Sequence, residues 1–367
     1  MLTSLLERSS WFIYKVGMPL VYFYHLLIAS VFLNTAAEDA QGLEKLANTA
    51  LIPMQYFFEG KTAIPTPDGT YTFERRFDYD HHFFAKTAAS TVALPFSLVI
   101  GSTLKSLSYL SPSTKERAAH IYAAAHSTNV SSNLDYYQSI GMQVEDYRDA
   151  PLIDPPRWER QAGAENQLLG DVEALQEIVR ILSKHNIPFW IDCGSCLGAY
   201  QYGGAIPGDW DIDVAVLVPD FENVKNALQE LDPKKFIVQD WSGRANPKTY
   251  LKVYIHETGG MIDLYHFAVD AEKTEIHTLF SNEHNIFSPT DWKEREKRYT
   301  VPMAFSTVFP LKKALFEGIE VPVPAQTEHY LQAFYGENLA PARVYSEITG
   351  NYEKDLSHPY WKTPHAH

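Results

Sequence analysis

The sequence predicts an α/β (α+β) fold, with a mixed sheet flanked by helices and an additional, mostly helical N-terminal region. Residues 164–187 carry an apolar stripe at helical spacing, and short apolar strands separated by turn residues follow as far as residue 269. The chain is 45% hydrophobic and 13% aromatic, enough to bury a full core. Its 367 residues suggest two domains, or one domain with a large extension.

The charge balance limits the partners. The formal net charge of −14 argues against nucleic acid, whose phosphates are bound by clustered lysine and arginine. An acidic protein can still handle nucleotides when metal ions screen their phosphates. The two cysteines, Cys193 and Cys196, are too few for a disulfide framework.

Residues 16–33 contain no formal charge and as a helix would be roughly 27 Å long, close to the thickness of a bilayer core. Arg8 and Lys15 precede the segment, and Glu38 and Asp39 follow it, which favours an N-terminus on the cytoplasmic side. Three interpretations compete: a membrane anchor, a cleaved signal and a buried core helix.

We therefore assign residues 1–35 as a hydrophobic N-terminal segment and the protein as membrane-associated, or as soluble and cytoplasmic if this segment is a core helix. A second apolar run, residues 87–104, is richer in small and hydroxyl side chains. That composition favours a buried helix or hairpin over a membrane span.

Three prolines between Pro151 and Pro156 mark the expected domain boundary. Residues 36–150 then form an N-terminal region whose role the sequence does not reveal. We expect residues 151–163 to be a Pro-rich linker, residues 164–345 a second domain and residues 346–367 a C-terminal tail.

The second domain is expected to begin with an amphipathic helix. Its apolar residues alternate in steps of four and three, which places them on one face: Leu168, Val172, Leu175, Val179 and Leu182. The segments that follow mix types. Strands are expected over 187–195, 210–218, 236–241, 250–257 and 260–269, a short helix or loop over 196–204 and a helix over 221–231.

Asp209, Asp211 and Asp213 stand at alternate positions at the start of the strand over 210–218. Residues two apart on a strand point the same way, so these carboxylates would share one face and repel one another. A divalent metal such as Mg²⁺ would relieve that repulsion. The alternative is an exposed turn with ordinary aspartates.

Two further features favour the metal. Gly194 and Ser195 follow an apolar strand, and a Gly-Ser turn opening a helix lets backbone N–H groups approach a phosphate. Asp263 lies in the middle of another apolar strand, where an unpaired carboxylate would be costly. If that strand neighbours Asp211 and Asp213, Asp263 completes a three-carboxylate site; the alternative is a salt bridge to a nearby lysine or arginine.

The stretch GSCLGAYQYGGAIPGDWDID, residues 194–213, resembles the pattern G-T-L-L-G-A-x-R-H-G-G-x-I-P-W-D-D-D-I-D of the LicD and fukutin-related family of phosphotransferases, which have a nucleotidyltransferase fold. MIDLYHF at 261–267 is similar to the family's later Asp-containing strand. Residues 308–336 are similar to its closing F-P-L … L-x-x-x-Y-G signature. The resemblance covers residues 164–339.

The resemblance implies a nucleotidyltransferase-like sheet and a catalytic domain over residues 164–345. The implied reaction moves phosphocholine, ribitol phosphate or glycerol phosphate from a CDP-linked alcohol to a hydroxyl of a glycan or glycolipid, with Mg²⁺ (or Mn²⁺). Asp211, Asp213 and Asp263 would be both metal ligands and catalytic residues.

Gly194 and Ser195 would cradle the donor phosphate. The chain departs from the family pattern at Gln201 and Tyr202, where the family has Arg and His, and at Gly208 and Trp210. Lys252, on the strand before Asp263, is the cation expected to replace the missing arginine.

Three other interpretations stay open. The C-x-x-C of Cys193 and Cys196 after a strand is also typical of thioredoxin-like redox sites. The D-x-D motif also fits a glycosyltransferase that uses a nucleotide sugar. Finally, a family member with these substitutions can be a catalytically degenerate protein.

Overall fold

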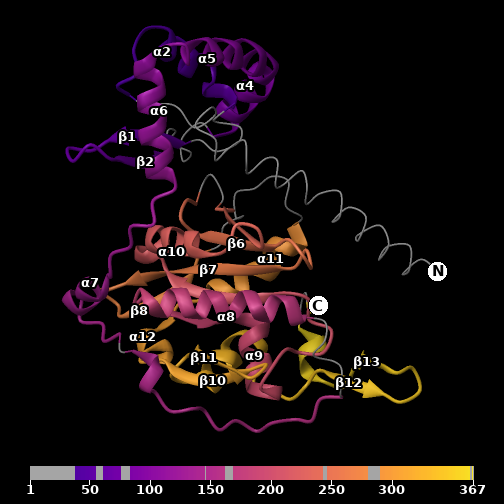
Figure 1. The fold of residues 1–367 in the computed structure, drawn as a ribbon. Helices are drawn as coiled ribbons and strands as arrows, with labels where there is room; N and C mark the ends of the chain where they lie inside the picture. Colours follow the sequence, from indigo (N-terminus) through magenta and orange to yellow (C-terminus); the bar gives the residue numbers. More distant parts are fainter. Residues whose placement is uncertain are drawn as a thin grey trace. The chain divides into compact units, whose positions relative to one another are not determined.

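The computed structural model describes residues 38–54, 61–75, 83–144, 146–161, 168–242, 246–279, 290–363 and 366. The chain divides into two compact units, Met1–Ser127 and Thr128–His367 (Figure 1). The predicted fold class, a mixed sheet with helices and a mostly helical N-terminal region, is confirmed. The apolar segment 16–33 lies outside the described residues.

The first unit combines helices with one antiparallel hairpin. The hairpin turns at Gly69, whose φ of 83° suits glycine, and whose N–H donates to Thr66 O at 3.0 Å. The described elements are α2 (Gly42–Ala50), β1 (Lys61–Pro65), β2 (Tyr71–Arg75), α4 (Phe83–Phe96), the π-helical η1 (Ser97–Gly101), α5 (Ser102–Ser108) and α6 (Pro112–Ala125).

α4, η1 and α5 form one continuous helical run. Among the described residues, Ala85–Ser108 is long and apolar enough to cross a membrane by length and composition, and 17% of that stretch is buried. Val92, Phe96 and Val99 are 76%, 68% and 67% exposed. Of the two structures expected at 87–104, a buried helix or hairpin, the segment forms a helix, but the expected burial is wrong, because the run packs against α2 and leaves its other faces exposed.

A buried polar cluster joins α2 to α5. Lys105, 1% exposed, donates to Glu44 Oε1 at 3.3 Å and to Asn48 Oδ1 at 3.0 Å. Thr114 of α6 donates to the other Glu44 oxygen. Because a buried ammonium needs partners, this cluster fixes which face of α5 meets α2.

The second unit is built on a mixed seven-stranded sheet. Its order is β3-β4-β7-β6-β5, and β8 pairs with both β7 and β9. β4 and β7 are parallel, and the other neighbours are antiparallel. The strands are β3 (Phe189–Ile191), β4 (Ile212–Leu217), β5 (Phe236–Asp240), β6 (Tyr250–Ile255), β7 (Met261–Asp270), β8 (Glu275–Thr278) and β9 (Met303–Ala304).

β4 is an interior strand of the sheet, between β3 and β7. All six of its residues are buried, as expected for a near-continuous apolar run paired on both edges. The amphipathic helix expected at the start of this domain is α8 (Leu169–Lys184), which packs against β6 and β7. α9 (Cys193–Tyr202) packs against β4 and α13.

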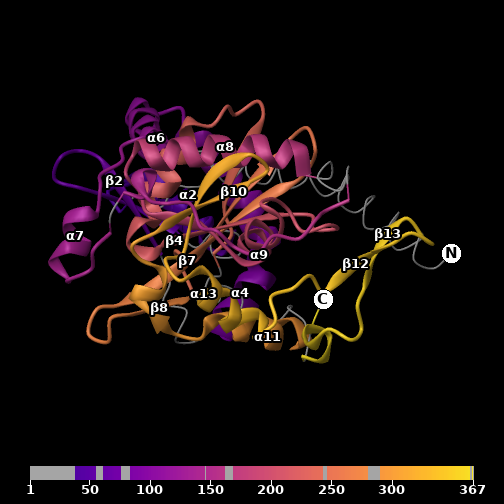
Figure 2. The same cartoon turned by 90° about the horizontal axis from the view of Figure 1, so that it is seen from below.

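The remaining elements surround this core, and the β12–β13 hairpin projects from the rest of the unit (Figure 2). They are α7 (Leu134–Ser139), η2 (Tyr147–Asp149), η4 (Val218–Asp220), α10 (Phe221–Ala227), η5 (Leu228–Glu230), α11 (Thr290–Lys297), η6 (Arg298–Thr300), α12 (Phe305–Val308), β10 (Lys312–Phe316), β11 (Ile319–Val323), α13 (Thr327–Tyr335), β12 (Arg343–Ser346), β13 (Asn351–Lys354) and η7 (Pro359–Lys362).

The Pro-rich stretch 151–163 is hydrogen-bonded to the second unit where it is described. Ile153 N–H donates to Lys313 O at 2.8 Å, and Trp158 N–H donates to Gln201 O at 2.8 Å. The division into compact units falls earlier, after Ser127. The assignment of this stretch as an interdomain linker, like the other predicted domain limits, stays a prediction.

Candidate active site

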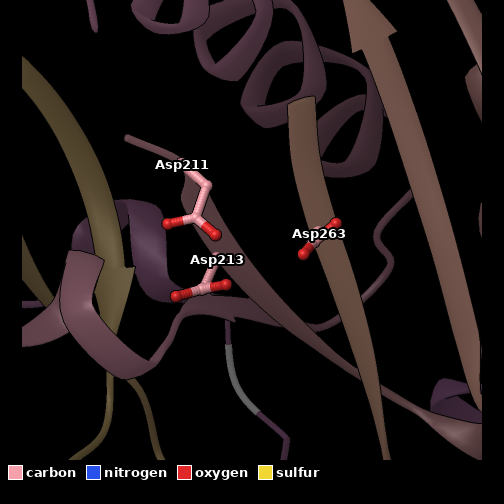
Figure 3. A group of neighbouring side chains, drawn as sticks. All are labelled: Asp211, Asp213 and Asp263. Atoms are coloured by element: carbon pink, nitrogen blue, oxygen red, sulfur yellow. The ribbon is translucent and has the colours of Figure 1, made fainter. Parts of the chain in front are cut away.

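Strand pairing brings three carboxylates together. Asp213 on β4 lies directly opposite Asp263 on β7 in the parallel register, so both side chains point to the same face. Asp211, two residues before Asp213, points to that face as well (Figure 3). One oxygen from each of the three lies within 4.8 Å of the others. β4 and β7, which carry Asp213 and Asp263, are therefore neighbours in the sheet, as a three-carboxylate site requires.

The cluster carries unfavourable charge. Asp213 is 8% exposed and Asp263 is 4% exposed. Burial, reinforced by the nearby carboxylates of Asp209 and Asp263, raises the pKa of Asp211 to about 7. Burial, reinforced by the carboxylates of Asp211 and Asp263, raises the pKa of Asp213 well above its ordinary value. A set of buried hard oxygen ligands with excess negative charge fits a divalent cation such as Mg²⁺.

Lys252 completes a row of charged residues across three strands. It lies opposite Asp263 in the β6–β7 register, and its Nζ is 2.8 Å from Asp263 Oδ1. The ammonium also lies over the ring of Tyr250, 5.1 Å from its centroid. The sequence left two alternatives for Asp263, a three-carboxylate cluster and a salt bridge. In the structure Asp263 takes part in both. The ammonium offsets part of the negative charge, and its predicted role at a donor phosphate stays a prediction.

Asp211 and Asp213, but not Asp263, line a cavity of about 370 Å³ within the second unit. Asp209, Asp211 and Asp213 line it together with Gly194, and Trp210 stands there 67% exposed. A Cβ at Gly194 would come within 2.9 Å of Asp209 Oδ2. Glycine therefore allows the Asp209 carboxylate to lie against the first turn of α9, whose N–H groups favour an anion.

Ser195, unlike Gly194, is buried and does not line the cavity. It is 1% exposed, and its Oγ accepts a hydrogen bond of 2.9 Å from the backbone N–H of Asp213. On the other side, Asp192 N–H donates to Asp213 O at 2.9 Å. These two bonds hold the backbone of a candidate metal ligand. The predicted contact of Gly194 and Ser195 N–H groups with a phosphate stays a prediction.

Asp192 connects this backbone to the core. Its carboxylate accepts from Cys193 N–H at 2.7 Å and from the Tyr330 hydroxyl at 2.5 Å, and Trp190 Nε1 donates to that hydroxyl. Burial raises the pKa of Asp192 to about 6, although the hydrogen bonds act in the opposite direction. The β3–α9 junction is therefore tied to α13.

Gln201 stands where the family pattern has an arginine, and its side chain is neutral. It is 3% exposed, lines the cavity, and donates from Nε2 to Leu339 O at 2.9 Å. Its side chain is thus used to hold the chain that follows α13.

The redox interpretation of Cys193 and Cys196 does not fit their surroundings. Both are free thiols, and Cys196 has no exposed surface. Burial, followed by the charge of Asp192, raises both thiol pKa values well above the ordinary value. A dithiol that exchanges disulfides needs a lowered pKa and access to its partner.

Sequence reasoning missed the C-terminal contribution to the cavity. Arg343, His358, Tyr360 and Trp361 line it, as do Arg295 and Glu296 of α11. A single basic or aromatic residue in a tail carries no pattern from which a site can be predicted. The dense run of polar and aromatic residues at 358–361 was the available signal.

Comparison with known proteins shows what this domain is similar to. Residues 186–326 match the family model described as LicD/FKTN/FKRP, nucleotidyltransferase domain. This part of the chain is therefore similar to the LicD and fukutin-related family. The resemblance predicted from the sequence is therefore confirmed.

Individual proteins match at low identity. An uncharacterized protein of Rickettsia typhi, RT0683, is 25% identical over 183 residues, which cover 50% of this chain and 51% of that protein. The ribitol-5-phosphate transferases FKTN of Macaca fascicularis and Homo sapiens are 26% and 25% identical over 167 residues, 45% of this chain and 32% of theirs. The chain thus spans about half or less of the length of these relatives.

We predict that Ser195→Ala destabilises the second unit by about 1–3 kcal/mol, because the buried Asp213 N–H loses its acceptor. Urea unfolding followed by tryptophan fluorescence measures this, since six of the seven tryptophans lie after residue 127. Ser139→Ala, which removes an exposed hydroxyl of the same unit bonded to Tyr136 O, is the control and should change stability by less than about 0.5 kcal/mol. Equal effects of the two substitutions would contradict the role given to Ser195.

We also predict slow thiol labelling of the native protein. At pH 7.5, without added metal, both cysteines should react roughly tenfold or more slowly than in urea, because Cys196 is buried and the raised pKa of Cys193, which lines the cavity, keeps that thiol protonated. Ellman's reagent measures the rates. Fast native labelling that yields a Cys193–Cys196 disulfide would restore the redox interpretation.

Proposed function

We propose that the second unit is a Mg²⁺-dependent phosphotransferase. Its donor would be a CDP-linked small alcohol of the choline, ribitol or glycerol type. Its acceptor would be a hydroxyl group of a glycan or glycolipid, and CMP would be released. The observation that carries the proposal is the pairing of Asp213 with Asp263 on adjacent parallel strands, with Asp211 beside them at a cavity.

The carboxylates of Asp211, Asp213 and Asp263 would hold Mg²⁺ (or Mn²⁺). When bound, the ion supplies charge neutralisation for the diphosphate and for the leaving CMP. The raised pKa values of Asp211 and Asp213 support this assignment, because buried carboxylates that repel one another gain most from a cation.

The protein's own groups would orient the reactants. Gly194 and Ser195 lie in the first turn of α9, where backbone N–H groups favour a phosphate. Asp263 would accept the proton of the attacking hydroxyl or orient it. Lys252 keeps Asp263 in place through the 2.8 Å ion pair and limits the charge of the cluster.

The relatives support the class of reaction. Two of them are named ribitol-5-phosphate transferase, which is a phosphotransferase activity of those proteins. The relatives support a phosphotransferase class only. The donor, acceptor and ion proposed for this chain are our own, more specific proposals, based on its residues.

We predict that one CDP-alcohol binds in a Mg²⁺-dependent way and that Asp211→Asn weakens its binding by about a hundredfold, or about 2.7 kcal/mol, because a ligand charge is lost. Calorimetric titration of CDP-choline, CDP-glycerol, CDP-ribitol and UDP-glucose, with and without Mg²⁺, measures this. Asp149→Asn, at an exposed aspartate of η2, is the matched control.

Preference for UDP-glucose would instead support a glycosyltransferase with the same D-x-D metal site. Absence of Mg²⁺-dependent binding by all four nucleotides would contradict the proposed function and indicate a domain that has kept its fold without the chemistry.

We further propose that the protein associates with a membrane. The exposed apolar side chains of α4, η1 and α5 support this, because a 24-residue helix is about 36 Å long and no formal charge occurs between Lys86 and Lys105. Large exposed apolar patches mark surfaces that meet a membrane or a partner.

We predict that Phe96→Asp with Val99→Asp lowers co-sedimentation with phosphatidylcholine vesicles by about tenfold or more, because two charges would enter the apolar layer. Ala119→Asp with Ala123→Asp, at exposed positions of α6, adds equal charge elsewhere and should leave vesicle binding nearly unchanged. Equal sedimentation of both variants and the wild type would argue against a membrane role of this helix.

A further inference from the structure

The chain after α13 forms one wall of the cavity. Ala342 O accepts hydrogen bonds from Asp355 N–H at 3.0 Å and from Trp361 Nε1 at 2.6 Å, which closes residues 342–361 into one local structure. Arg343 and His358 both line the cavity from this structure. It lies beyond the family match at residues 186–326.

The hydrogen bonding of His358 determines where its proton lies. Its Nδ1 accepts a hydrogen bond of 3.2 Å from Tyr360 N–H, which caps η7. A ring nitrogen that accepts carries no proton, so the neutral imidazole carries its proton on Nε2. His358 is 6% exposed, and within the described part of the chain Nε2 is buried with no hydrogen-bond partner.

A buried donor without an acceptor is unfavourable, and native proteins rarely keep one. Because His358 lines the cavity, a ligand that brings an acceptor atom would satisfy it. The capping bond to Tyr360 prevents the ring from turning to find another acceptor without losing that bond.

Arg343 supplies positive charge to the same cavity. Its guanidinium lies over the Trp361 ring, 5.5 Å from the centroid, and makes no ion pair within 4 Å to a described carboxylate. Arg295, the other arginine lining the cavity, is paired with Glu296 at 2.9 Å. The charge of Arg343 acts on the Asp209 carboxylate in the same cavity, opposing the effect of burial on the pKa of Asp209. Since no ion pair within 4 Å engages its guanidinium among the described residues, the forked donors of Arg343 remain for an anion.

We propose that His358, through Nε2–H, and Arg343, through its guanidinium, bind a phosphate group of the ligand that enters this cavity. The identity of that ligand as a CDP-linked donor rests on the proposed function, but the two donors recognise the phosphate itself. This binding makes the C-terminal segment part of the active site and supplies a cation that Gln201 does not.

The test separates binding from folding. His358→Asn keeps an acceptor for Tyr360 N–H, since asparagine caps helices well, but its shorter amide has no donor at the position of Nε2. Arg343→Gln removes the charge without touching that cap. Arg180→Gln, an exposed arginine paired with Glu177 on α8, is the matched control.

The probes are Mg²⁺ with inorganic pyrophosphate, with CDP and with cytidine, titrated by calorimetry into the full chain. We expect each of the two variants to weaken pyrophosphate and CDP binding by about tenfold or more, as for loss of a hydrogen bond to a charged group. Cytidine affinity, the urea midpoint and the Arg180→Gln protein should stay unchanged.

Unchanged pyrophosphate and CDP affinities in both variants would overturn the proposal, as would failure of the wild type to bind any phosphate probe. Losses that extend equally to cytidine would indicate a packing role and overturn it too. If the wild type binds pyrophosphate through these residues but no CDP-alcohol, the inference stands and the proposed donor is wrong.

Discussion

The parallel pairing of β4 with β7 is the constraint on which the candidate site depends. It aligns Asp213 with Asp263, and the neighbouring antiparallel β6 then brings Lys252 beside Asp263. A shift of one residue would turn every β7 side chain to the other face, leaving Asp263 among apolar neighbours. The buried residues of β4, together with the bonds from Asp192 and Ser195 to the Asp213 backbone, hold this register.

Much of this arrangement could be predicted from the sequence. Short apolar runs separated by turn residues predict the positions of β3 to β7, because buried strands are nearly continuous apolar runs, but they do not predict β8 to β13. The spacing of Asp211 and Asp213 predicts one shared face, and the isolated Asp263 within an apolar run predicts a partner. Comparison with known proteins then confirmed the LicD and fukutin-related likeness of residues 186–326.

Other features could not be predicted, for identifiable reasons. The exposure of Phe96 depends on what packs beside its helix, and apolar composition alone cannot distinguish a core helix from an exposed one. The bond from Gln201 to Leu339 O joins residues far apart in the chain. His358 becomes informative only when the partner of one ring nitrogen and the burial of the other are known together.

The distance along the chain between the carboxylates has a thermodynamic consequence. Asp211 and Asp213 are separated from Asp263 by α10, β5 and β6, so the three come together only in the folded sheet. An ion that binds all three therefore binds the native state and not the unfolded chain, and stabilises the fold by mass action. Without such an ion, the repulsion among these buried carboxylates weakens the β4–β7 pairing. The residues proposed for chemistry thus also couple the stability of the sheet to the concentration of divalent cation.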